Sequence, residues 1–316
     1  MYKVIVTARS FGQADPAPLR FLEESGCVVE KLKIDNPLPA AELAARVKDA
    51  DGVIAGLDEY DASVIQAAEK LKVISRYGVG YDKVDLEAAR RKGVAVTNTP
   101  GTNENSVADL AMTLMLCCSR NIIPNDRHTK SGSGPRLMGT EMWNKTLGII
   151  GTGRIGKGLA RRAKGFSMRI LAYDAYPDPA FASEIGLAYC GLDRLLRESD
   201  FISIHCPLND ATRNLVGAKA ISAMKDGAIL VNTARGGIVD EDALYDALSA
   251  GKLAAAGLDV TLNDPPAGSP LLARDNCVMT PHIGGYTDDA VLSMGMVAAQ
   301  NLVLILKGEP CPFRVA

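Results

Sequence analysis

The feature that most constrains the fold is a glycine-rich segment near the middle of the 316-residue chain, LGIIGTGRIG at residues 147–156. It combines an apolar strand pattern, a tight turn and the start of a helix. Gly151 permits the turn, Gly153 lets the backbone approach a pyrophosphate, and Gly156 lets the helix pack closely on the strand. The N–H groups that open such a helix attract an anion. Because similar turns also arise for packing reasons, this spacing by itself is only a weak indication of a dinucleotide site.

The next predicted strand supports the dinucleotide interpretation. It covers residues 169–174 and ends in Asp174, at the distance from the glycines where an acid binds the adenine ribose 2′-hydroxyl. A carboxylate at that place repels a 2′-phosphate. The sequence therefore favours NAD over NADP.

Composition and charge exclude several classes of protein. The chain is 47% hydrophobic and carries a formal net charge of −2, which suits two globular domains of ordinary size. No basic block is present, so we expect neither nucleic acid nor a membrane surface as a partner. There is no signal-peptide pattern, and the apolar run at 297–306 falls short of the ~20 residues of a membrane span. We expect a cytoplasmic protein.

Cysteine and histidine positions argue against a metal site. The seven cysteines include no CxxC motif, and Cys117 adjoins Cys118 in an apolar helical stretch, which indicates core thiols rather than disulfides. The histidines, at 128, 205 and 282, are widely separated. We expect no metal.

Strand and helix patterns alternate in two series, which predicts an α/β fold with two parallel sheets. The first series has strands near residues 4–6, 27–29, 52–55, 73–75 and 94–97, and the second near 147–150, 170–173, 201–205, 228–232, 255–259 and 277–280. Between them, a helix capped by Asn105 or Ser106 is expected to run to about Ser119. Residues 124–140 are expected to be irregular, as a mobile loop or a partner-facing arm.

The end of the chain decides the domain organisation. A long apolar helix is predicted over Asp288–Leu306, after the second series is complete. If the second domain covers 100–284, this helix returns to the first domain, which then consists of residues 1–99 and 285–316. The active site is expected in the cleft between the domains.

Three side chains suited to acid–base chemistry follow strands of the second series. Arg235 can fork onto a carboxylate or carbonyl, and His282 supplies an imidazole, a group suited to taking a hydroxyl proton. Asp264 can orient the imidazole and stabilise its charged form. Each also has an ordinary interpretation, Arg235 as a surface cation, His282 as a helix cap and Asp264 as a turn initiator. His205 is expected to pack near the cofactor rather than to act as a catalyst.

Two glycines, Gly78 and Gly80, follow the fourth predicted strand, in the segment RYGVGYD at residues 76–82. Ligands of open α/β sheets collect at such strand ends. A tight turn before the helix predicted at 85–92 is an equally good interpretation.

Several motifs in fixed order resemble the D-isomer-specific 2-hydroxyacid dehydrogenases. They are GTGRIG at 151–156, NTARGGIVDEDAL at 232–244, AGLDV at 256–260, the acid before the Pro-Pro pair at 265–266, and PHIGGYT at 281–287. Residues 76–101 are most similar to the D-3-phosphoglycerate dehydrogenase branch. The resemblance covers nearly the whole chain, and weakly its first 50 residues. It implies a flavodoxin-like substrate domain, with a Rossmann NAD-binding domain inserted in it, and a homodimer.

The resemblance also implies roles for individual residues. His282 is the general acid/base, Arg235 orients the substrate, and Asp264 stands where the family usually has Glu, one methylene longer. The substrate carboxylate is expected at Gly78, Val79 and Gly80, with Arg76 as a nearby positive charge. The implied NAD site comprises Ser106, Gly151, Gly153, Arg154, Ile155, Gly156, Asp174, Cys206, Pro207, Thr233, Ala234, Asp259 and Gly285.

The sequence leaves the substrate open. Phosphoglycerate enzymes of the family commonly have an Arg-Ser pair after the third strand, where this chain reads IAGLDE at 54–59. Two acids there would repel a phosphate. The alternatives to 3-phosphoglycerate are therefore hydroxypyruvate, glyoxylate or a sulfonated hydroxy acid. An NAD(H)-sensing binding protein or corepressor of the same fold is the alternative from another class. The chain ends at Ala316, so we expect neither the family's regulatory domain nor feedback inhibition by serine.

Overall fold

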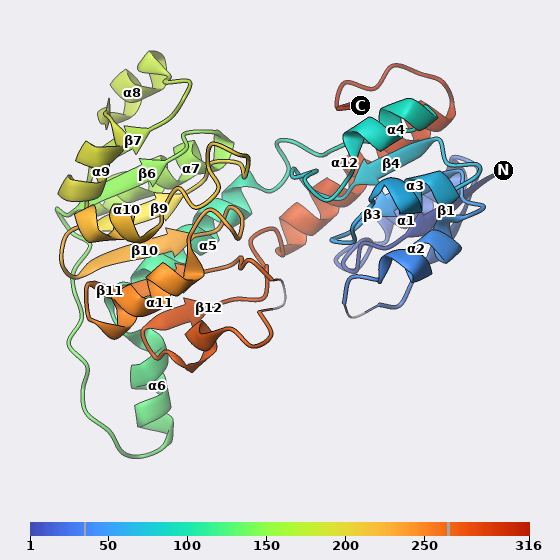
Figure 1. Ribbon diagram of the computed structural model, residues 1–316. Helices are drawn as coiled ribbons and strands as arrows, with labels where there is room; N and C mark the ends of the chain where they lie inside the picture. Colours follow the sequence, from blue (N-terminus) through green and yellow to red (C-terminus); the bar gives the residue numbers. More distant parts are fainter. Residues whose placement is uncertain (35, 264–265) are drawn as a thin grey trace. The chain divides into compact units, whose positions relative to one another are not determined.

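The computed structural model describes every residue except Asp35, Asp264 and Pro265. The chain forms two compact units (Figure 1). The first comprises Met1–Asn103 and Gly285–Ala316, and the second comprises Glu104–Gly284. The second unit is therefore an insertion within the first.

The first unit is built on a five-stranded parallel sheet with the order β2-β1-β3-β4-β5. This order is that of flavodoxin-like folds. All five strands predicted from the sequence are present. Their bounds are β1 (Tyr2–Val6), β2 (Cys27–Lys31), β3 (Gly52–Ala55), β4 (Val73–Arg76) and β5 (Ala95–Thr97).

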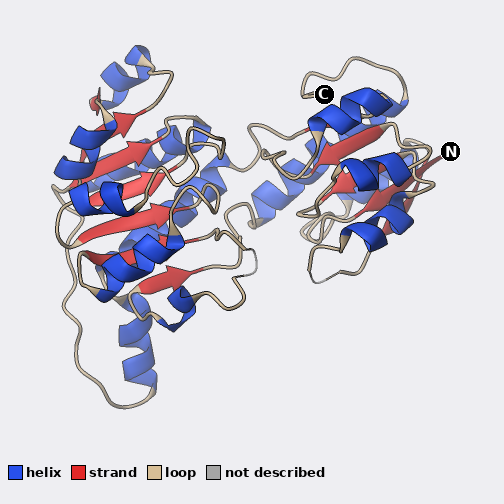
Figure 2. Cartoon of the chain, viewed as in Figure 1, coloured by secondary structure: helices blue, strands red, loops and turns tan. Residues whose placement is uncertain are grey.

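Helices cover both faces of this sheet (Figure 2). On one face, α1 (Ala17–Glu24) packs beside α12 (Asp288–Leu306), and Leu22, Ala298 and Leu302 are fully buried there. The other face carries α2 (Ala40–Val47), α3 (Ala62–Ala67) and α4 (Leu86–Lys92). Because α12 packs against β3 and β4, the last segment of the chain completes a core that the first segment began.

The second unit contains a seven-stranded parallel sheet with the order β12-β11-β10-β9-β6-β7-β8. Counted from β6, this is the Rossmann order 3-2-1-4-5-6 with a seventh strand added. The direction of winding reverses at β6, which lies between β9 and β7. The strands are β6 (Thr146–Ile150), β7 (Arg169–Tyr173), β8 (Leu187–Tyr189), β9 (Phe201–Ile204), β10 (Ala228–Asn232), β11 (Leu253–Leu258) and β12 (Cys277–Met279). The prediction of two parallel-sheet α/β domains is confirmed.

Two hydrophobic clusters hold the helices of this unit on their sheet. One cluster joins α5 (Glu104–Ser119), α7 (Arg154–Ala163) and α8 (Pro179–Ile185) to one face. The other joins α9 (Leu192–Glu198), α10 (Ala218–Ala223) and α11 (Glu241–Ser249) to the opposite face. Short 3₁₀ segments cover Lys164–Phe166 and Pro270–Ala273.

Three local predictions for the second unit were wrong. The edge strand β8 was missed because its three residues are too few to show a period of two. Residues 122–130 form α6 (Ile122–Lys130), whereas an irregular segment was expected from 124. This helix is largely exposed, so it lacks the apolar periodicity that reveals buried helices. The helix α5 starts at Glu104, so Asn105 and Ser106 lie inside its first turn instead of capping it.

The last helix has the predicted bounds, but the estimate that its apolar run covers only residues 297–306 was wrong. By length and composition α12 could cross a membrane, because its apolar character extends well before residue 297. Taken together as one bent pair, α5 and α6 also pass this test. More than half of α12 is buried inside the protein. That burial is typical of a core helix.

We expect the core position of α12 to make Leu302 important for stability. Leu302→Ala should lower the free energy of unfolding by about 2–5 kcal/mol, since it removes a fully buried side chain and leaves a cavity. The control Leu272→Ala changes a side chain that is 57% exposed and should stay within about 0.5 kcal/mol of the wild type. Urea denaturation measures both. Equal effects of the two substitutions would contradict the assigned packing.

Candidate functional site

Two of the three motif glycines in the second unit are required by packing. Gly151 has φ +95°, and a Cβ there would lie 2.6 Å from the backbone nitrogen of Cys206. A Cβ on Gly156 would lie 2.1 Å from the carbonyl oxygen of Gly151. A larger residue at 156 would push the helix α7 away from the end of β6, and a larger residue at 151 would push the turn away from the backbone that follows β9.

Gly153 has no such internal reason to be a glycine. Its φ is −63°, and a Cβ on it would meet no atom of the described residues within 4 Å. It precedes the ten-residue helix α7, whose first turn contains Arg154 and Ile155 and no acid. The open space beside the N–H groups at this helix start is what a pyrophosphate requires. These residues fit a dinucleotide.

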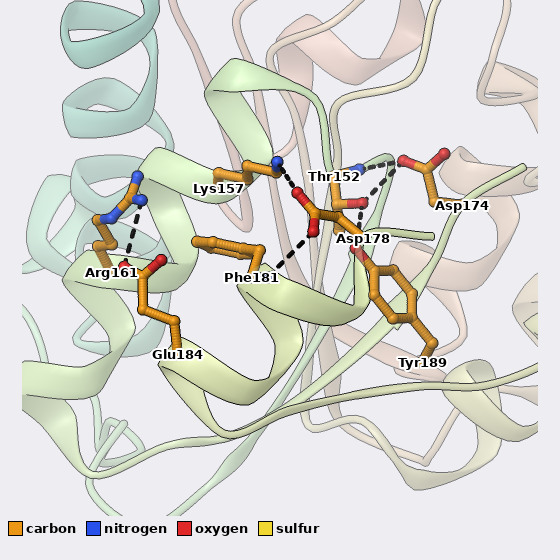
Figure 3. A network of polar contacts seen from close by, with 8 residues as sticks. All are labelled: Thr152, Lys157, Arg161, Asp174, Asp178, Phe181, Glu184 and Tyr189. Atoms are coloured by element: carbon orange, nitrogen blue, oxygen red, sulfur yellow. Dashed lines mark hydrogen bonds and ion pairs between the residues drawn. The ribbon is translucent and has the colours of Figure 1, made fainter. Parts of the chain in front are cut away.

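Asp174 lies just after β7 and is held by three hydrogen bonds, of which those from Thr152 are drawn in Figure 3. One carboxylate oxygen accepts from the backbone N–H of Thr152 at 2.5 Å and from its hydroxyl at 2.9 Å. The other oxygen accepts from the backbone N–H of Tyr176 at 2.8 Å. Desolvation acts to raise the pKa of Asp174, but the bonds from Tyr176 and Thr152 outweigh it and hold the pKa below its usual value. The carboxylate is therefore ionised at neutral pH and accepts hydrogen bonds only.

A second hydroxyl extends this arrangement. The hydroxyl of Tyr189, at the end of β8, lies 2.9 Å from that of Thr152. Because the single hydroxyl proton of Thr152 goes to Asp174, Tyr189 is the donor in this pair. Sequence reasoning missed both residues. Thr152 could have been noticed because it stands between the first two motif glycines.

Beside this network, an ion pair joins α7 to the start of α8. The ammonium group of Lys157 lies 2.5 Å from a carboxylate oxygen of Asp178, which also caps α8 by accepting from the N–H of Phe181 (Figure 3). Lys157 and Arg161 both lie over the Phe181 ring. These contacts fix the segment between β7 and α8, which follows Asp174.

The ends of β9 and β10 present buried polar atoms. The Nε2 of His205 lies 2.9 Å from the Ser203 hydroxyl, whereas its Nδ1 has no partner among the described residues. The hydroxyl of Thr233 is also buried and has no hydrogen-bond partner among the described residues. Burial lowers the pKa of His205 to about 3, so its imidazole is neutral at physiological pH. Buried polar atoms normally have partners, and a polar ligand at these neighbouring strand ends would supply them.

Cys206 and Pro207 follow His205 directly, and Cys206 contacts the Gly151 turn through its backbone. Burial raises the pKa of the Cys206 thiol to about 11. The thiol is therefore protonated at neutral pH and unreactive.

Arg235 lies in a turn that is folded by a buried side chain. Asn232, at the end of β10, donates its amide to the carbonyl of Arg235 at 2.8 Å and accepts from the N–H of Ala234 at 3.0 Å. Arg235 is half-buried and donates to the Ala234 carbonyl at 2.7 Å. Gly236 allows a further close approach, since a Cβ there would lie 1.9 Å from the Thr261 carbonyl oxygen. The segment after β11 thus lies directly on the arginine turn.

Asp264, the predicted partner of the histidine, lies outside the described residues. The chain before it is well anchored, because the N–H of Leu262 donates to Glu241 at 2.5 Å and the Thr261 hydroxyl to the carbonyl of Asn263 at 2.6 Å. The role of Asp264 stays a prediction.

His282 follows β12 in a strained conformation. Its φ is +53°, a left-handed value that is uncommon for residues other than glycine and is often found at functional sites. Its N–H donates to the backbone carbonyls of Asp259 and Thr280. The imidazole is half-buried, at the carboxyl edge of the sheet.

The side chain of Asp259 holds this turn. It is 2% exposed and accepts from the Thr280 hydroxyl at 2.6 Å and from the N–H groups of Ile283 and Gly284, each at 2.8 Å. Burial raises the pKa of Asp259 although these bonds act in the opposite direction. Ser106 adds a hydroxyl bond of 2.6 Å to the carbonyl of Gly284. Thus Asp259 and Ser106, both predicted at the cofactor, also position the residues around His282. Gly285 begins the second segment of the first unit.

In the first unit, buried or nearly buried side chains donate hydrogen bonds to the carbonyls of the turn after β4. Arg76 is 5% exposed and donates to the carbonyls of Gly80 at 3.0 Å and Ala55 at 2.7 Å. The amide of Asn98 donates to the carbonyl of Val79 at 2.8 Å. Of the two acids after β3, Asp58 is buried and accepts from the N–H of Leu38, while Glu59 is exposed.

In the part of the chain that the structure describes, no three His, Cys, Asp or Glu side chains lie close enough together to hold a metal ion.

Comparison with protein families identifies a related domain. Residues 112–284 match the model of the "D-isomer specific 2-hydroxyacid dehydrogenase, NAD binding domain". The matched region contains the glycine turn, Asp174, Arg235 and His282.

Curated relatives share about two fifths of the residues. A glyoxylate reductase of Korarchaeum cryptofilum is 42% identical, over 89% of this chain and 87% of the relative. A hydroxypyruvate reductase of Thermotoga maritima is 44% identical, over 79% of this chain and 82% of the relative. A D-3-phosphoglycerate dehydrogenase of Methanocaldococcus jannaschii is 42% identical over 98% of this chain, which spans only 58% of that longer protein.

Solved structures agree over the full length. The TT0316 protein of Thermus thermophilus matches with a TM-score of 0.89 and 41% identity, covering 99% of this chain and 100% of the other. A D-lactate dehydrogenase of Lactobacillus jensenii, solved with NAD+, matches with a TM-score of 0.78 and 30% identity, covering 99% of each chain.

We expect Asp174 to set the preference between dinucleotides. Asp174→Ala should raise KM for NAD about ten-fold or more, because a hydrogen bond to a charged acceptor is lost, and should improve the use of NADP by removing the repulsion of a 2′-phosphate. Steady-state kinetics with both dinucleotides measures the change. The control Asp178→Ala removes a neighbouring carboxylate and should keep the NAD preference. An unchanged preference in Asp174→Ala would contradict the ribose role.

Proposed function

Because this chain belongs to the D-isomer specific 2-hydroxyacid dehydrogenase family, we propose that it interconverts a small D-2-hydroxy acid and the corresponding 2-oxo acid. The predicted family, the reaction class of an oxidoreductase acting on a CH–OH group, and the cofactor NAD are confirmed. The observation that carries the proposal for this chain is the turn at His282, where a strained histidine is held at the sheet edge by the buried Asp259.

We assign the cofactor site to the carboxyl edge of the seven-stranded sheet. Bound NAD supplies the hydride acceptor, and NADH the hydride donor. The turn from Gly151 to Gly156, with Arg154 and Ile155, would hold the pyrophosphate, and Asp174 the adenine ribose. The buried polar atoms of His205 and Thr233 that lack partners among the described residues suit the polar groups of a dinucleotide. The remaining proposed contacts are Ser106, Cys206, Pro207, Ala234, Asp259 and Gly285.

We assign proton transfer to His282. In the oxidation direction its neutral imidazole takes the hydroxyl proton of the substrate, and in reduction the imidazolium returns a proton to the carbonyl oxygen. The guanidinium of Arg235 fixes the substrate carboxylate and polarises its carbonyl. Asp264 would stabilise the imidazolium. The backbone of Gly78, Val79 and Gly80 would bind the substrate carboxylate.

The segment after β3 favours an unphosphorylated substrate. It has no basic residue, and its buried acid Asp58 has one carboxylate oxygen without a partner among the described residues. Arg76, the positive charge that the sequence suggested near the substrate, directs two of its donors to backbone carbonyls. Glyoxylate and hydroxypyruvate, the substrates in the names of two relatives, fit this site better than 3-phosphohydroxypyruvate.

We also propose a cytoplasmic homodimer. The exposed apolar side chains Ile122, Ile123 and Met138, on α6 and the segment after it, suit a second copy of this chain.

The substrate proposal predicts a ranking in an NADH-oxidation assay. Glyoxylate and hydroxypyruvate should be reduced with a kcat/KM at least about ten-fold above that of 3-phosphohydroxypyruvate, because a phosphate next to a buried carboxylate is repelled. The opposite ranking would favour the phosphoglycerate reaction. Binding of NADH without turnover of any 2-oxo acid would refute the proposed enzyme.

The role assignment predicts large losses of turnover. His282→Ala and Arg235→Ala should each reduce kcat/KM by about 10²–10⁴-fold. The first removes the group that transfers the proton, and the second removes the guanidinium that orients the substrate and polarises its carbonyl. The affinity for NADH, measured by fluorescence titration, should stay within about two-fold. His128→Ala, on the exposed helix α6, is the control and should retain turnover. Wild-type turnover in either site variant would overturn its assigned role.

A further inference from the structure

The turn after β4 has an unusual hydrogen-bond pattern. Its three consecutive carbonyls, of Gly78, Val79 and Gly80, each accept a bond from the first unit: from the N–H of Thr99 at 3.0 Å, the amide of Asn98 at 2.8 Å and Nε of Arg76 at 3.0 Å. In a trans peptide the C=O and N–H point in opposite directions. The next three N–H groups, from Val79 to Tyr81, therefore point away from these donors.

These three N–H groups are available for a ligand. Within the described part of the chain, no hydrogen bond from the N–H of Val79, Gly80 or Tyr81 is recorded. The residues Val79 and Tyr81 are 38% and 40% exposed, so this turn is on the surface of the first unit. Successive N–H groups in a turn form a concavity that binds anions.

Arg76 fixes this turn through hydrogen bonds to backbone carbonyls. It is 5% exposed and joins the turn to the end of β3, through Gly80 and Ala55. A guanidinium donates in a planar fork with fixed directions, so it sets the orientation of the Gly80 peptide and also places a positive charge behind it.

Asn98 is anchored independently of the turn that it holds. Its backbone N–H donates to the carbonyl of Phe313, and its carbonyl accepts from the amide of Asn301 at 2.9 Å. Asn301 is 2% exposed on α12, and the thiol of Cys311 donates to its side-chain oxygen at 3.3 Å. The position of the Asn98 side chain is therefore fixed by α12 and the last residues of the chain.

We propose that Arg76 and Asn98 are positioning residues that preorganise the turn from Gly78 to Tyr81 to bind the carboxylate of the 2-oxo acid. Arg76 acts through the Gly80 peptide and is not the ligand of a substrate phosphate. The inference rests on the proposed function, in which this turn meets the substrate. Donors fixed before binding require no reorganisation when the anion arrives, so their loss weakens substrate binding.

The two roles of Arg76 predict different substrate profiles. All 2-oxo acids share the carboxylate, whereas only 3-phosphohydroxypyruvate carries a phosphate. A positioning role therefore weakens every substrate by a similar factor. A direct phosphate contact weakens the phosphorylated substrate alone.

The test measures KM and kcat for glyoxylate, hydroxypyruvate and 3-phosphohydroxypyruvate in wild type, Asn98→Ala and Arg76→Lys, with NADH affinity measured by fluorescence. We expect Asn98→Ala to raise KM for all three acids about five- to ten-fold, the effect of about one hydrogen bond, with kcat and NADH affinity within about two-fold of wild type. Arg76→Lys keeps the charge but loses the fork, and should raise all three KM values at least as much. Asn98→Asp places an oxygen against the Val79 carbonyl and should be worse than Asn98→Ala.

Controls separate this inference from fold damage and from the proposed function. Asn276→Ala also removes side-chain bonds to backbone carbonyls, in the second unit, and should leave every KM unchanged. Thermal unfolding verifies that the variants are folded, and Asn98→Ala tests the inference alone if Arg76→Lys does not fold. An active wild type with unchanged KM values in Asn98→Ala, or a loss in Arg76→Lys confined to the phosphorylated acid, would overturn the inference. A wild type that reduces none of the acids would overturn the proposed function itself.

Discussion

The close approach of α7 to β6 is the constraint on which the second unit depends. Only a hydrogen on Gly156 leaves room for the Gly151 carbonyl oxygen, and only a glycine at 151 combines positive φ with contact to the Cys206 backbone. With both contacts made, the N-terminus of α7 lies beside Gly153, where a Cβ would meet no atom from the part of the chain that the structure describes. The same turn presents Thr152 to Asp174. One packing requirement thus shapes the phosphate site and the ribose site together.

A common device holds the turns that carry the proposed chemistry. A buried polar side chain at or just past the end of a strand bonds to the backbone of a nearby turn: Asn232 for the arginine turn, Asp259 for the histidine turn, and Asn98 for the turn after β4. These side chains are buried beneath the edge of a parallel sheet, where an unpaired polar group would be costly. Their bonding requirement therefore keeps the turns in one conformation. Function is placed on loops, but the sheets supply the rigidity.

Sequence reasoning succeeded where periodicity or a strong motif exists. The long strands were found because a buried parallel strand is apolar along its length, and the glycine turn was found from its spacing. It failed for β8 and α6, since a three-residue edge strand and an exposed helix carry little apolar pattern. The candidate site residues were identified by type and order. The residues that hydrogen-bond to them, directly or through one another, such as Thr152, Tyr189 and Asn98, were not identified, because they look like ordinary polar residues until their partners are known.

The sequence by itself determined the family, the reaction class and the cofactor, because these depend on motifs whose residues are close together in the chain. The tertiary structure decided which groups are available for binding. It placed Arg76 behind a turn, buried Asp58, and turned the carboxylate of Asp259 toward Thr280, Ile283 and Gly284. The physical reason is that burial and hydrogen-bond partners come from segments far apart in sequence. A charged residue can bind a ligand only with the donors and acceptors that the fold has not already used.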